Sequence, residues 1–233
     1  MSIDNAKVLE ELNILNIKGI LIDIDNTLYA YEPMHKNAIE ACYKKISKVE
    51  NLDIDLTKFK AMYRRSRTLV TESLSPNAFC RSRALAFEVM FRELNINQPF
   101  SKAYVYEEIY WNEFVREIVP FDYIIQFLER CKSNNLIIAA ITDMQFNFQA
   151  KKLHSLKLDQ FIDFLVTSEE ALFEKPHSAI FELAINKMNL NKNDVIMIGD
   201  SYDKDIVGAK NAGIRSLHIC LLYTSDAADD TRS

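Results

Sequence analysis

A short apolar run lies near the start of the chain, and further short apolar runs alternate with helical patterns through its second half. Residues 17–22 are almost entirely apolar and rich in isoleucine, which is typical of a strand buried on both faces of a parallel sheet. Similar runs predict four further strands, and the segments between them have helical periodicity. The strands are expected at 136–141, 161–166, 195–198 and 216–219, and the helices at 122–133, 145–156, 176–188 and after Ser201. This alternation predicts an α/β fold with a parallel, Rossmann-like sheet flanked by helices.

The segment from residue 30 to residue 119 interrupts this alternation and contains no strand-like run. Its apolar residues keep helical spacing and predict roughly four helices, at 33–49, 56–74, 81–94 and 103–117. A shorter amphipathic pattern predicts a leading helix at 4–15. We therefore expect an α/β catalytic core formed by residues 1–29 and 120–219, with an all-helical cap domain at 30–119 inserted into it.

The composition is that of an ordinary soluble globular protein, with 48% hydrophobic and 26% charged residues in a chain of 233. No apolar run approaches the ~20 residues that cross a bilayer, and residues 1–13 lack the apolar core of a signal peptide. We expect a cytoplasmic protein with no membrane partner. The net charge of −5 argues against nucleic acid as a partner. The cysteines lack C-x-x-C spacing and are expected to be reduced thiols: Cys42, Cys80, Cys131 and Cys220.

The last residues of the chain have an unusual sequence. Residues 220–230 resemble one reading frame of the transposon-end adapter that is used to make sequencing libraries. We therefore expect the natural sequence to stop near Ile219, and we leave 220–233 out of the fold prediction as an adapter-derived tail. The composition does not fix the oligomeric state.

Polar residues follow three of the predicted strands. Asp23 and Asp25 follow the first strand, Thr142 ends the second and Asp200 follows the fourth. Ligands of open α/β sheets bind beyond the carboxyl ends of the strands, so we expect these side chains to form one site, with Lys175 ahead of a nearby helix. For Asp23 and Asp25 an alternative remains, namely an Asx turn that merely ends the strand.

Three carboxylates that converge on one site would repel one another without a cation. Carboxylate, carbonyl and water ligands suit Mg²⁺, and Mg²⁺ in turn suggests a phosphorylated substrate. A carboxylate can attack phosphorus to form an acyl phosphate if a metal ion and a lysine neutralise the phosphoryl oxygens and a second acid protonates the leaving alkoxide. The residues of the predicted site match these roles.

The same residues belong to four motifs in a fixed order. They are Asp23-Ile24-Asp25-Asn26-Thr27, Thr142, Lys175-Pro176 and Gly199-Asp200-Ser201-Tyr202-Asp203-Lys204-Asp205. Through them, residues 17–219 resemble the haloacid dehalogenase-like hydrolase superfamily, in its phosphatase type with a helical cap inserted after the first motif. Four ordered motifs are far more specific than any one of them.

The resemblance implies a role for each motif residue. Asp23 would be the nucleophile and Asp25 the general acid/base, while Thr142 and Lys175 would bind the phosphoryl group. Mg²⁺ would be held by Asp23, the Asp25 carbonyl and Asp200, with Asp205 supporting the metal shell. A departing halide needs no proton, whereas an alkoxide does, so the second acid Asp25 favours a phosphatase over a dehalogenase.

Three positions depart from the family pattern or are ambiguous. Asp143 occupies a substrate-binding position where related proteins more often have Asn. Its carboxylate either points away and leaves its backbone N–H near the phosphate, or alters the choice of substrate. His177 replaces a frequent Asp and is expected to cap a helix that has Pro176 in its first turn. Asp203 is expected to be the N-cap of the following helix rather than a metal ligand.

The predicted cap contains several arginines, and most of them are expected to lie on a solvated helix face. Arg81 and Arg83 follow a turn at 75–77, and we expect these two to reach the substrate. His35, His154 and His218 have no partners at metal-ligand spacing and are expected to be surface or core residues.

The sequence thus predicts an Mg²⁺-dependent phosphomonoesterase that forms an aspartyl-phosphate on Asp23. Its partner would be a small phosphorylated metabolite, either a nucleotide or a sugar phosphate. Two alternatives stay open. A phosphomutase would use the same residues, and a catalytically silent binding module would keep the scaffold without turnover, although the intact Asp23, Asp25, Lys175 and Asp200 argue against silence.

Overall fold

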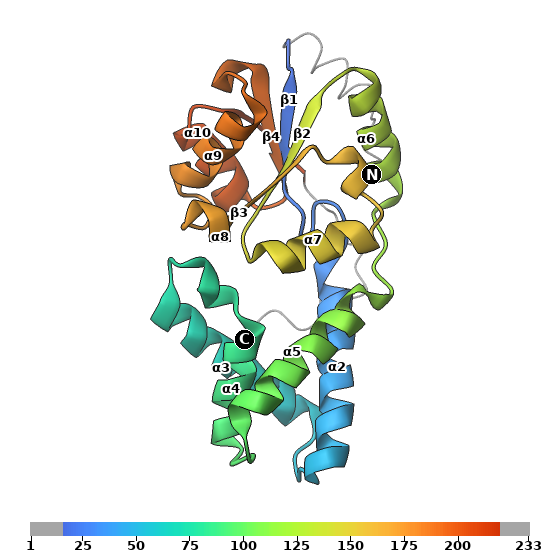
Figure 1. Cartoon of the computed structure of the whole chain (residues 1–233), viewed down its shortest axis with the longest axis vertical. Helices are drawn as coiled ribbons and strands as arrows, with labels where there is room; N and C mark the ends of the chain where they lie inside the picture. The colour runs from blue at the N-terminus through green and yellow to red at the C-terminus, as the bar shows by residue number, and fades with distance from the viewer. Residues whose placement is uncertain (1–15, 220–233) are drawn as a thin grey trace.

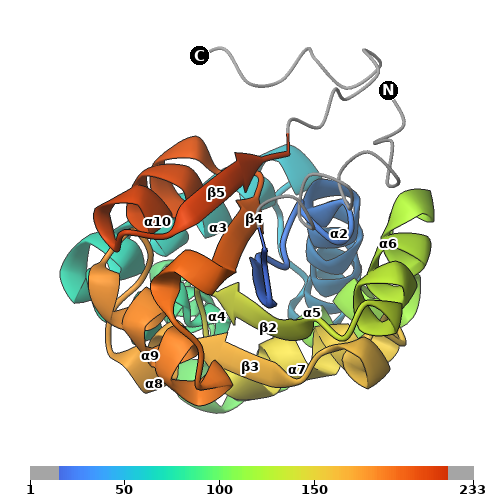
Figure 2. The same cartoon turned by 90° about the horizontal axis from the view of Figure 1, so that it is seen from above.

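The computed structural model describes residues 16–219 and contains a parallel sheet of five strands in the order β3-β2-β1-β4-β5 (Figure 2). The strands are β1 (Gly19–Ile22), β2 (Ile137–Thr142), β3 (Phe164–Thr167), β4 (Val195–Gly199) and β5 (Arg215–His218). Each lies where the apolar runs predict a strand. The predicted parallel, Rossmann-like sheet is therefore confirmed.

Successive residues of the central strands point into two different apolar layers. In β1, Ile20 and Ile22 pack in the layer that contains α6 (Asp122–Ser133), whereas Leu21 packs in the layer that contains α9 (Ser178–Met188). The residues of β2 and β4 alternate in the same way. Because helices cover both faces, almost every strand position has to be apolar, which is the pattern that the sequence shows.

The other elements of the core are short. They are α7 (Phe146–Ser155), η2 (Asp159–Phe161), α8 (Ser168–Ala171), η3 (Lys192–Asp194), the π-helical turn η4 (Tyr202–Val207) and α10 (Gly208–Asn211). The predicted start of the third strand at residue 161 is wrong. Residues 159–161 form the 3₁₀ turn η2, in which the Phe161 N–H bonds to the Leu158 carbonyl at 3.0 Å, so the strand begins only at Phe164.

The start of α9 also differs from the prediction. Pro176 is not in the first turn of the helix, because it lies in a turn that the His177 N–H closes on the Glu174 carbonyl at 3.0 Å. The helix begins at Ser178, and the His177 ring accepts a hydrogen bond from the Ala179 N–H at 3.2 Å. The predicted role of His177 as a helix cap is thus confirmed.

The helical segment between β1 and α6 forms a bundle beyond the edge of the sheet at which β1 ends (Figure 1). It consists of α2 (Tyr31–Glu50), α3 (Leu56–Leu74), η1 (Ala78–Arg81), α4 (Arg83–Glu93) and α5 (Pro99–Arg116). Residues 30–119 contain no strand, so the predicted insertion of an all-helical cap is confirmed. The domain boundaries at residues 29 and 120 stay a prediction. The leading helix at 4–15 and the adapter-like tail from residue 220 lie outside the described residues.

The bundle has an aromatic core of its own. Phe87 on α4 is fully buried, and its ring centroid lies 4.9 Å from that of Tyr63 on α3 and 5.6 Å from that of Phe91. Burial of each large side chain of this kind contributes about 1.5–3 kcal/mol. Over residues 16–219, no helix combines the length and the apolar character that are needed to cross a membrane.

Candidate active site

The three central strands bring the predicted polar residues to one edge of the sheet. β1 lies between β2 and β4, with Asp23 directly after β1, Thr142 at the end of β2 and Asp200 directly after β4. The register of the strands places their carboxyl ends side by side, because Ile22 lies opposite both Ala140 and Ile198. The first bend after β1 is fixed by the Asp23 N–H, which donates to the Ile198 carbonyl at 3.0 Å.

Asp23 is nearly buried at this edge and is paired with a lysine. Lys175 Nζ donates to Asp23 Oδ1 at 2.6 Å, and the Thr27 hydroxyl donates to Asp23 Oδ2 at 3.5 Å. Burial raises the pKa of the Asp23 carboxyl well above its usual range, and the nearby carboxylates of Asp205 and Asp25 add to the increase, while the Lys175 ammonium opposes it. The carboxylate is therefore held at the site by one cation and lies among other acids.

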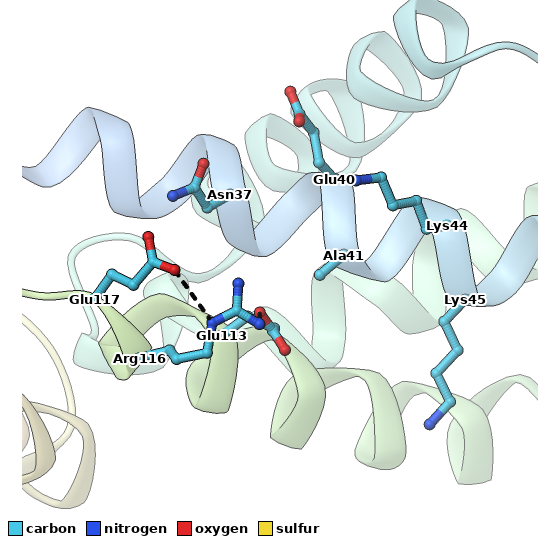
Figure 3. A pocket seen from close by; sticks show the side chains of 8 residues that line it. All are labelled: Asn37, Glu40, Ala41, Lys44, Lys45, Glu113, Arg116 and Glu117. Carbon is cyan, nitrogen blue, oxygen red and sulfur yellow. Dashed lines mark ion pairs between the residues drawn. The ribbon is translucent and has the colours of Figure 1, made fainter.

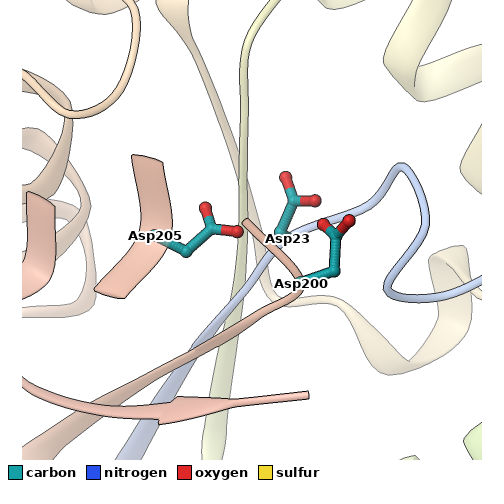
Figure 4. Close-up of side chains that lie close together, drawn as sticks. All are labelled: Asp23, Asp200 and Asp205. Carbon is teal, nitrogen blue, oxygen red and sulfur yellow. The ribbon is translucent and has the colours of Figure 1, made fainter. Parts of the chain in front are cut away.

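Asp23, Asp200 and Asp205 form a cluster of carboxylates (Figure 4). Each offers an oxygen that lies within 4.8 Å of those of the other two. Gly199 allows this approach, because a Cβ at that position would lie 2.2 Å from Asp205 Oδ2. Burial and the neighbouring Asp205 raise the pKa of Asp200. An oxygen-only set of this kind fits Mg²⁺, since the hard cation would neutralise carboxylates that otherwise repel one another.

Lys175 supplies positive charge to the same cluster. Its Nζ contacts Asp23 Oδ1, Asp205 Oδ1 at 2.7 Å and the Ile141 carbonyl at 3.2 Å. Burial alone would lower the pKa of Lys175, but Asp23, Asp205 and Asp143 raise it above its ordinary value. The lysine is therefore a fixed cation at the edge of the sheet, one hydrogen bond from the predicted nucleophile.

Asp143 is part of this network instead of being an unpaired acid. Its Oδ1 accepts the Lys175 N–H at 2.8 Å, and its Oδ2 accepts from Lys204 Nζ at 2.6 Å. The neighbouring Thr142 hydroxyl accepts from Gln149 Nε2 at 2.8 Å. Of the two alternatives for Asp143, these contacts favour the first, in which the carboxylate is turned away to its own partners.

Asp25 is held by two residues of α7 that the sequence did not single out. Lys152 Nζ donates to both Asp25 oxygens, at 2.7 and 2.9 Å, and Gln149 Nε2 donates to Oδ2 at 3.4 Å. The Tyr29 hydroxyl makes a further short hydrogen bond to Oδ1. Burial would raise the pKa of Asp25, but Lys152 and the hydrogen bonds hold it below its usual value. The only sequence signal for Lys152 and Gln149 was their i, i+3 spacing on the helix after Thr142.

Comparison with known families identifies this constellation. A family model described as haloacid dehalogenase-like hydrolase matches residues 17–213, which include every predicted residue of the site. The chain belongs to this family. The resemblance that the four motifs predicted is confirmed, and so is the fold class.

Two relatives of this hydrolase are phosphatases from archaea. The chain is 28% identical to a ribulose-1,5-bisphosphate 5-phosphatase of Halopiger xanaduensis, over 92% of this chain and 88% of the relative. It is 26% identical to a glyceraldehyde 3-phosphate phosphatase of Methanopyrus kandleri, over 87% of this chain and 84% of the relative. The prediction of an enzyme of the phosphatase type, a phosphoric monoester hydrolase, is confirmed at this level.

Solved structures support the same fold. A HAD phosphatase from Thermococcus onnurineus superposes with a TM-score of 0.66 at 20% identity, covering 91% of this chain and 92% of the other. A 2-haloacid dehalogenase from Pseudomonas syringae superposes with a TM-score of 0.73 at 18% identity, covering 91% of each chain. At these identities the likeness concerns the fold alone.

The two arginines predicted to reach the substrate have different surroundings in this hydrolase. Arg81 Nε and Nη2 donate to the two carboxylate oxygens of Glu174, at 2.6 and 2.7 Å, so this residue ties η1 to the core next to Lys175. Arg83 is buried in the bundle, where its guanidinium donates to the Tyr31 and Tyr63 hydroxyls. The guanidinium lies 5.0 Å from the centroid of the Tyr110 ring. Arg81 thus pairs with Glu174, whereas Arg83 forms no ion pair within residues 16–219.

The remaining predictions concern single polar residues. Asp203 is not the N-cap of the helix after β4, because the Ser201 hydroxyl occupies that role and accepts from the Lys204 N–H at 3.4 Å. His35 is partly buried, and this burial together with Arg83 lowers its pKa to about 3, so it is neutral. His154 is exposed, and His218 contacts the Asp200 carbonyl at 2.8 Å.

A surface pocket lies away from this constellation, between α2 and α5 (Figure 3). It is lined by Asn37, Glu40, Ala41, Lys44, Lys45, Glu113, Arg116 and Glu117. Arg116 forms ion pairs there with Glu113 at 2.5 Å and Glu117 at 3.7 Å. Glu40 pairs instead with Lys60, at 2.9 Å, and none of the lining residues belongs to the predicted site.

Proposed function

We propose that the protein is an Mg²⁺-dependent phosphomonoesterase that acts through a phosphoryl group carried on Asp23. The observation that supports this most strongly is the nearly buried Asp23 carboxylate, with Lys175 Nζ 2.6 Å away and the acids Asp200 and Asp205 beside it. A nucleophilic carboxylate, a fixed cation and a donor set for a divalent ion are the parts that phosphoryl transfer requires.

In the first half of the proposed reaction, a carboxylate oxygen of Asp23 forms a bond to phosphorus, and the bond between phosphorus and the leaving-group oxygen breaks. Lys175 and the Thr142 hydroxyl bind the phosphoryl oxygens. Asp25 must be protonated for this step, in which it gives its proton to the leaving-group oxygen, and that oxygen takes the electron pair of the broken bond. The Lys152 ammonium lowers the pKa of Asp25 and so opposes this protonated form. Asp23, Asp200 and the Asp25 carbonyl would hold an Mg²⁺ ion, with Asp205 supporting them, and this ion would neutralise the phosphoryl charge.

In the second half, Asp25 accepts a proton from water, and the water oxygen bonds to phosphorus. The bond between phosphorus and the Asp23 oxygen breaks, so inorganic phosphate leaves and Asp23 regains its carboxylate. The Lys152 ammonium suits this half, because it favours the ionised Asp25 that can take the proton. If a sugar hydroxyl replaced water, the product would be that of a phosphomutase, so the release of inorganic phosphate decides between the two outcomes.

For the substrate we propose a small sugar phosphate over a nucleotide. The two archaeal relatives described above have names that specify phosphorylated sugars, one a bisphosphate and the other a triose phosphate. The test is a panel of sugar phosphates and nucleoside monophosphates, assayed with Mg²⁺ for released phosphate. Faster release from every nucleotide than from every sugar phosphate would contradict the proposed substrate class.

Chelation should abolish the activity. Because the three acids offer only oxygen ligands, excess chelator should reduce the rate to about 1% or less, and added Mg²⁺ should restore it, whereas Ca²⁺ should support little turnover. Mg²⁺ should also raise the melting temperature of the wild type, and an Asp200→Asn variant should lose that increase. Undiminished turnover in excess chelator would contradict the assignment of the metal site.

Arg83→Gln should change substrate preference more than it changes the chemistry. Loss of a buried guanidinium that donates to Tyr31 and Tyr63 should raise KM for the preferred sugar phosphate about 10-fold. Hydrolysis of 4-nitrophenyl phosphate should stay within about 3-fold of the wild type, because the core residues are intact. Arg65→Gln is the matched control, since Arg65 is exposed and its one ion pair within residues 16–219 is with Glu93, at 2.9 Å. Equal losses on all substrates would instead indicate a role of Arg83 in folding.

A further inference from the structure

Lys152 is a buried cation that no family motif includes. It lies on α7, its side chain is fully buried, and its Nζ binds both oxygens of Asp25. Within residues 16–219, Asp25 is the one carboxylate within ion-pair distance of this lysine. Burying an unpaired ammonium group costs folding free energy, and Asp25 is the partner that offsets this cost for Lys152.

Aromatic rings enclose the ammonium group. Lys152 Nζ lies within 5.3–6.0 Å of four ring centroids, those of Tyr29, Tyr31, Trp111 and Phe114. The last three belong to the helical bundle, and Tyr29 to the segment after β1. Trp111 on α5 also stacks on Phe148 of α7, with ring centroids 4.6 Å apart, where the two helices meet (Figure 1). The bundle thus fixes the place of Lys152 through cation–π contacts.

The contacts of Asp25 leave it little freedom. Lys152, Gln149 and Tyr29 all donate to its carboxylate, yet 29% of the Asp25 side chain remains exposed. One flank of the acid is held by protein donors, and another is open for a substrate. Misplacement of a reacting group by about 1 Å can cost on the order of 10²-fold in rate, so a holder of Asp25 affects the chemistry directly.

We propose that Lys152 is a positioning residue of the reaction, which holds the Asp25 carboxylate in the orientation for proton exchange with the leaving-group oxygen while aromatic side chains of the helical bundle hold Lys152. The inference rests on the proposed function, because it requires Asp25 to be the general acid/base. It gives the bundle a part in catalysis through Trp111 and Phe114, besides the selection of the substrate.

The test compares leaving groups. Nitrophenolate leaves without a proton, whereas an alkoxide needs one, so a defect in Asp25 affects alkyl phosphates selectively. Lys152→Met should lower kcat on ribulose 1,5-bisphosphate and glycerol 2-phosphate by about 10²-fold, with KM within about 3-fold of the wild type. On 4-nitrophenyl phosphate the loss should be below about 5-fold. A merely structural role would lower the rates on both kinds of substrate equally.

Lys151→Met is the matched control. Lys151 is the preceding residue on α7 and also contacts α5, through a hydrogen bond from its Nζ to Asn112 Oδ1 at 2.6 Å, but it does not touch Asp25. Its variant should behave like the wild type with both kinds of substrate. A Lys152→Met variant that matches Lys151→Met, or one that loses activity equally with aryl and alkyl phosphates, would overturn the inference.

Asp25→Asn separates this inference from the proposed function. If Asp25→Asn hydrolyses alkyl phosphates at the wild-type rate, the general acid/base assignment and the inference both fail. If Asp25→Asn is selectively impaired but Lys152→Met is not, only the inference fails. Because Lys152→Met leaves a buried acid unpaired and can fail to fold, the double variant Asp25→Asn/Lys152→Met is measured as well. It should have the rates of Asp25→Asn, and a further loss on alkyl phosphates would overturn the inference.

Discussion

Asp23→Asn should lose phosphatase activity by several orders of magnitude. The variant keeps an oxygen that can accept the hydrogen bond from Lys175, at 2.6 Å in the wild type, but an amide cannot form the acyl phosphate. The expected loss corresponds to more than ~4 kcal/mol of transition-state free energy. The measurement is phosphate release from the preferred sugar phosphate, together with acid quenching and peptide mass analysis, which should find a phosphoryl group on the peptide containing Asp23 in the wild type only.

Two controls make this result specific. Asp203→Asn changes an exposed acid of η4 that lies outside the cluster of three carboxylates, and it should retain wild-type turnover. The melting temperature of Asp23→Asn should change little, because the Asn oxygen can still accept from Lys175 and Lys175 remains paired with Asp205. Deamidation of the new Asn would regenerate the wild type, so the mass of the sample must be checked. Substantial activity in a sample free of deamidation would rule out the covalent mechanism.

The fold could be predicted because the hydrophobic patterns that mark its helices and strands are local and agree with one another. The predicted helices at 56–74 and 122–133 coincide with α3 and α6, whose amphipathic patterns have clear ends. Asp55, for example, caps α3 by accepting the Lys58 N–H at 2.7 Å. Strands buried on both faces leave short, almost unbroken apolar runs in the sequence. Two of the wrong boundaries, at Phe161 and Pro176, lie in short turns whose hydrogen bonds have no counterpart in hydrophobic periodicity.

The residues of the candidate site were predictable where the topology alone brings them together. Asp23, Thr142 and Asp200 follow strands that are neighbours in the sheet, so the strand order determines that they meet. Lys175 was expected at the site because it lies ahead of a nearby helix, whereas Asp205 came from the resemblance to the family. Their contact at 2.7 Å depends on the path of two loops, which periodicity does not determine.

Lys152 and the partner of Arg81 could not be predicted in the same way. Lys152 appears in the sequence as one polar position of an amphipathic helix, and most such lysines are solvated. Its burial arises only when α5 packs against α7. Likewise, the pairing of Arg81 with Glu174 joins residues 93 positions apart, on opposite sides of the interface between bundle and core. Contacts of this kind depend on how the helical bundle packs against the α/β core.

Lys175→Met should reduce both activity and stability strongly. Lys175 is the cation that Asp23 and Asp205 share, and its removal leaves two nearly buried carboxylates without their partner. Breaking a buried pair in this way typically costs about 3–5 kcal/mol of folding free energy. Turnover should fall by on the order of 10³-fold or more, because the phosphoryl oxygens lose a fixed positive charge. Lys204→Met is the control, since Lys204 is partly exposed and its pair with Asp143 should contribute only about 1 kcal/mol.

The stability loss of Lys175→Met should depend on pH with a definite sign. Burial, Asp205 and Asp25 raise the pKa of Asp23, and Lys175 is the cation that opposes them, so its removal raises that pKa further. A group with a raised pKa in the folded state binds more protons there than in the unfolded chain, so stability falls as the pH rises through that pKa. The melting temperature of the variant, measured without divalent cations, should therefore fall further below that of the wild type at pH 8 than at pH 5. Equal melting temperatures of variant and wild type at both pH values would show that Lys175 is not the counter-charge that holds these carboxylates together.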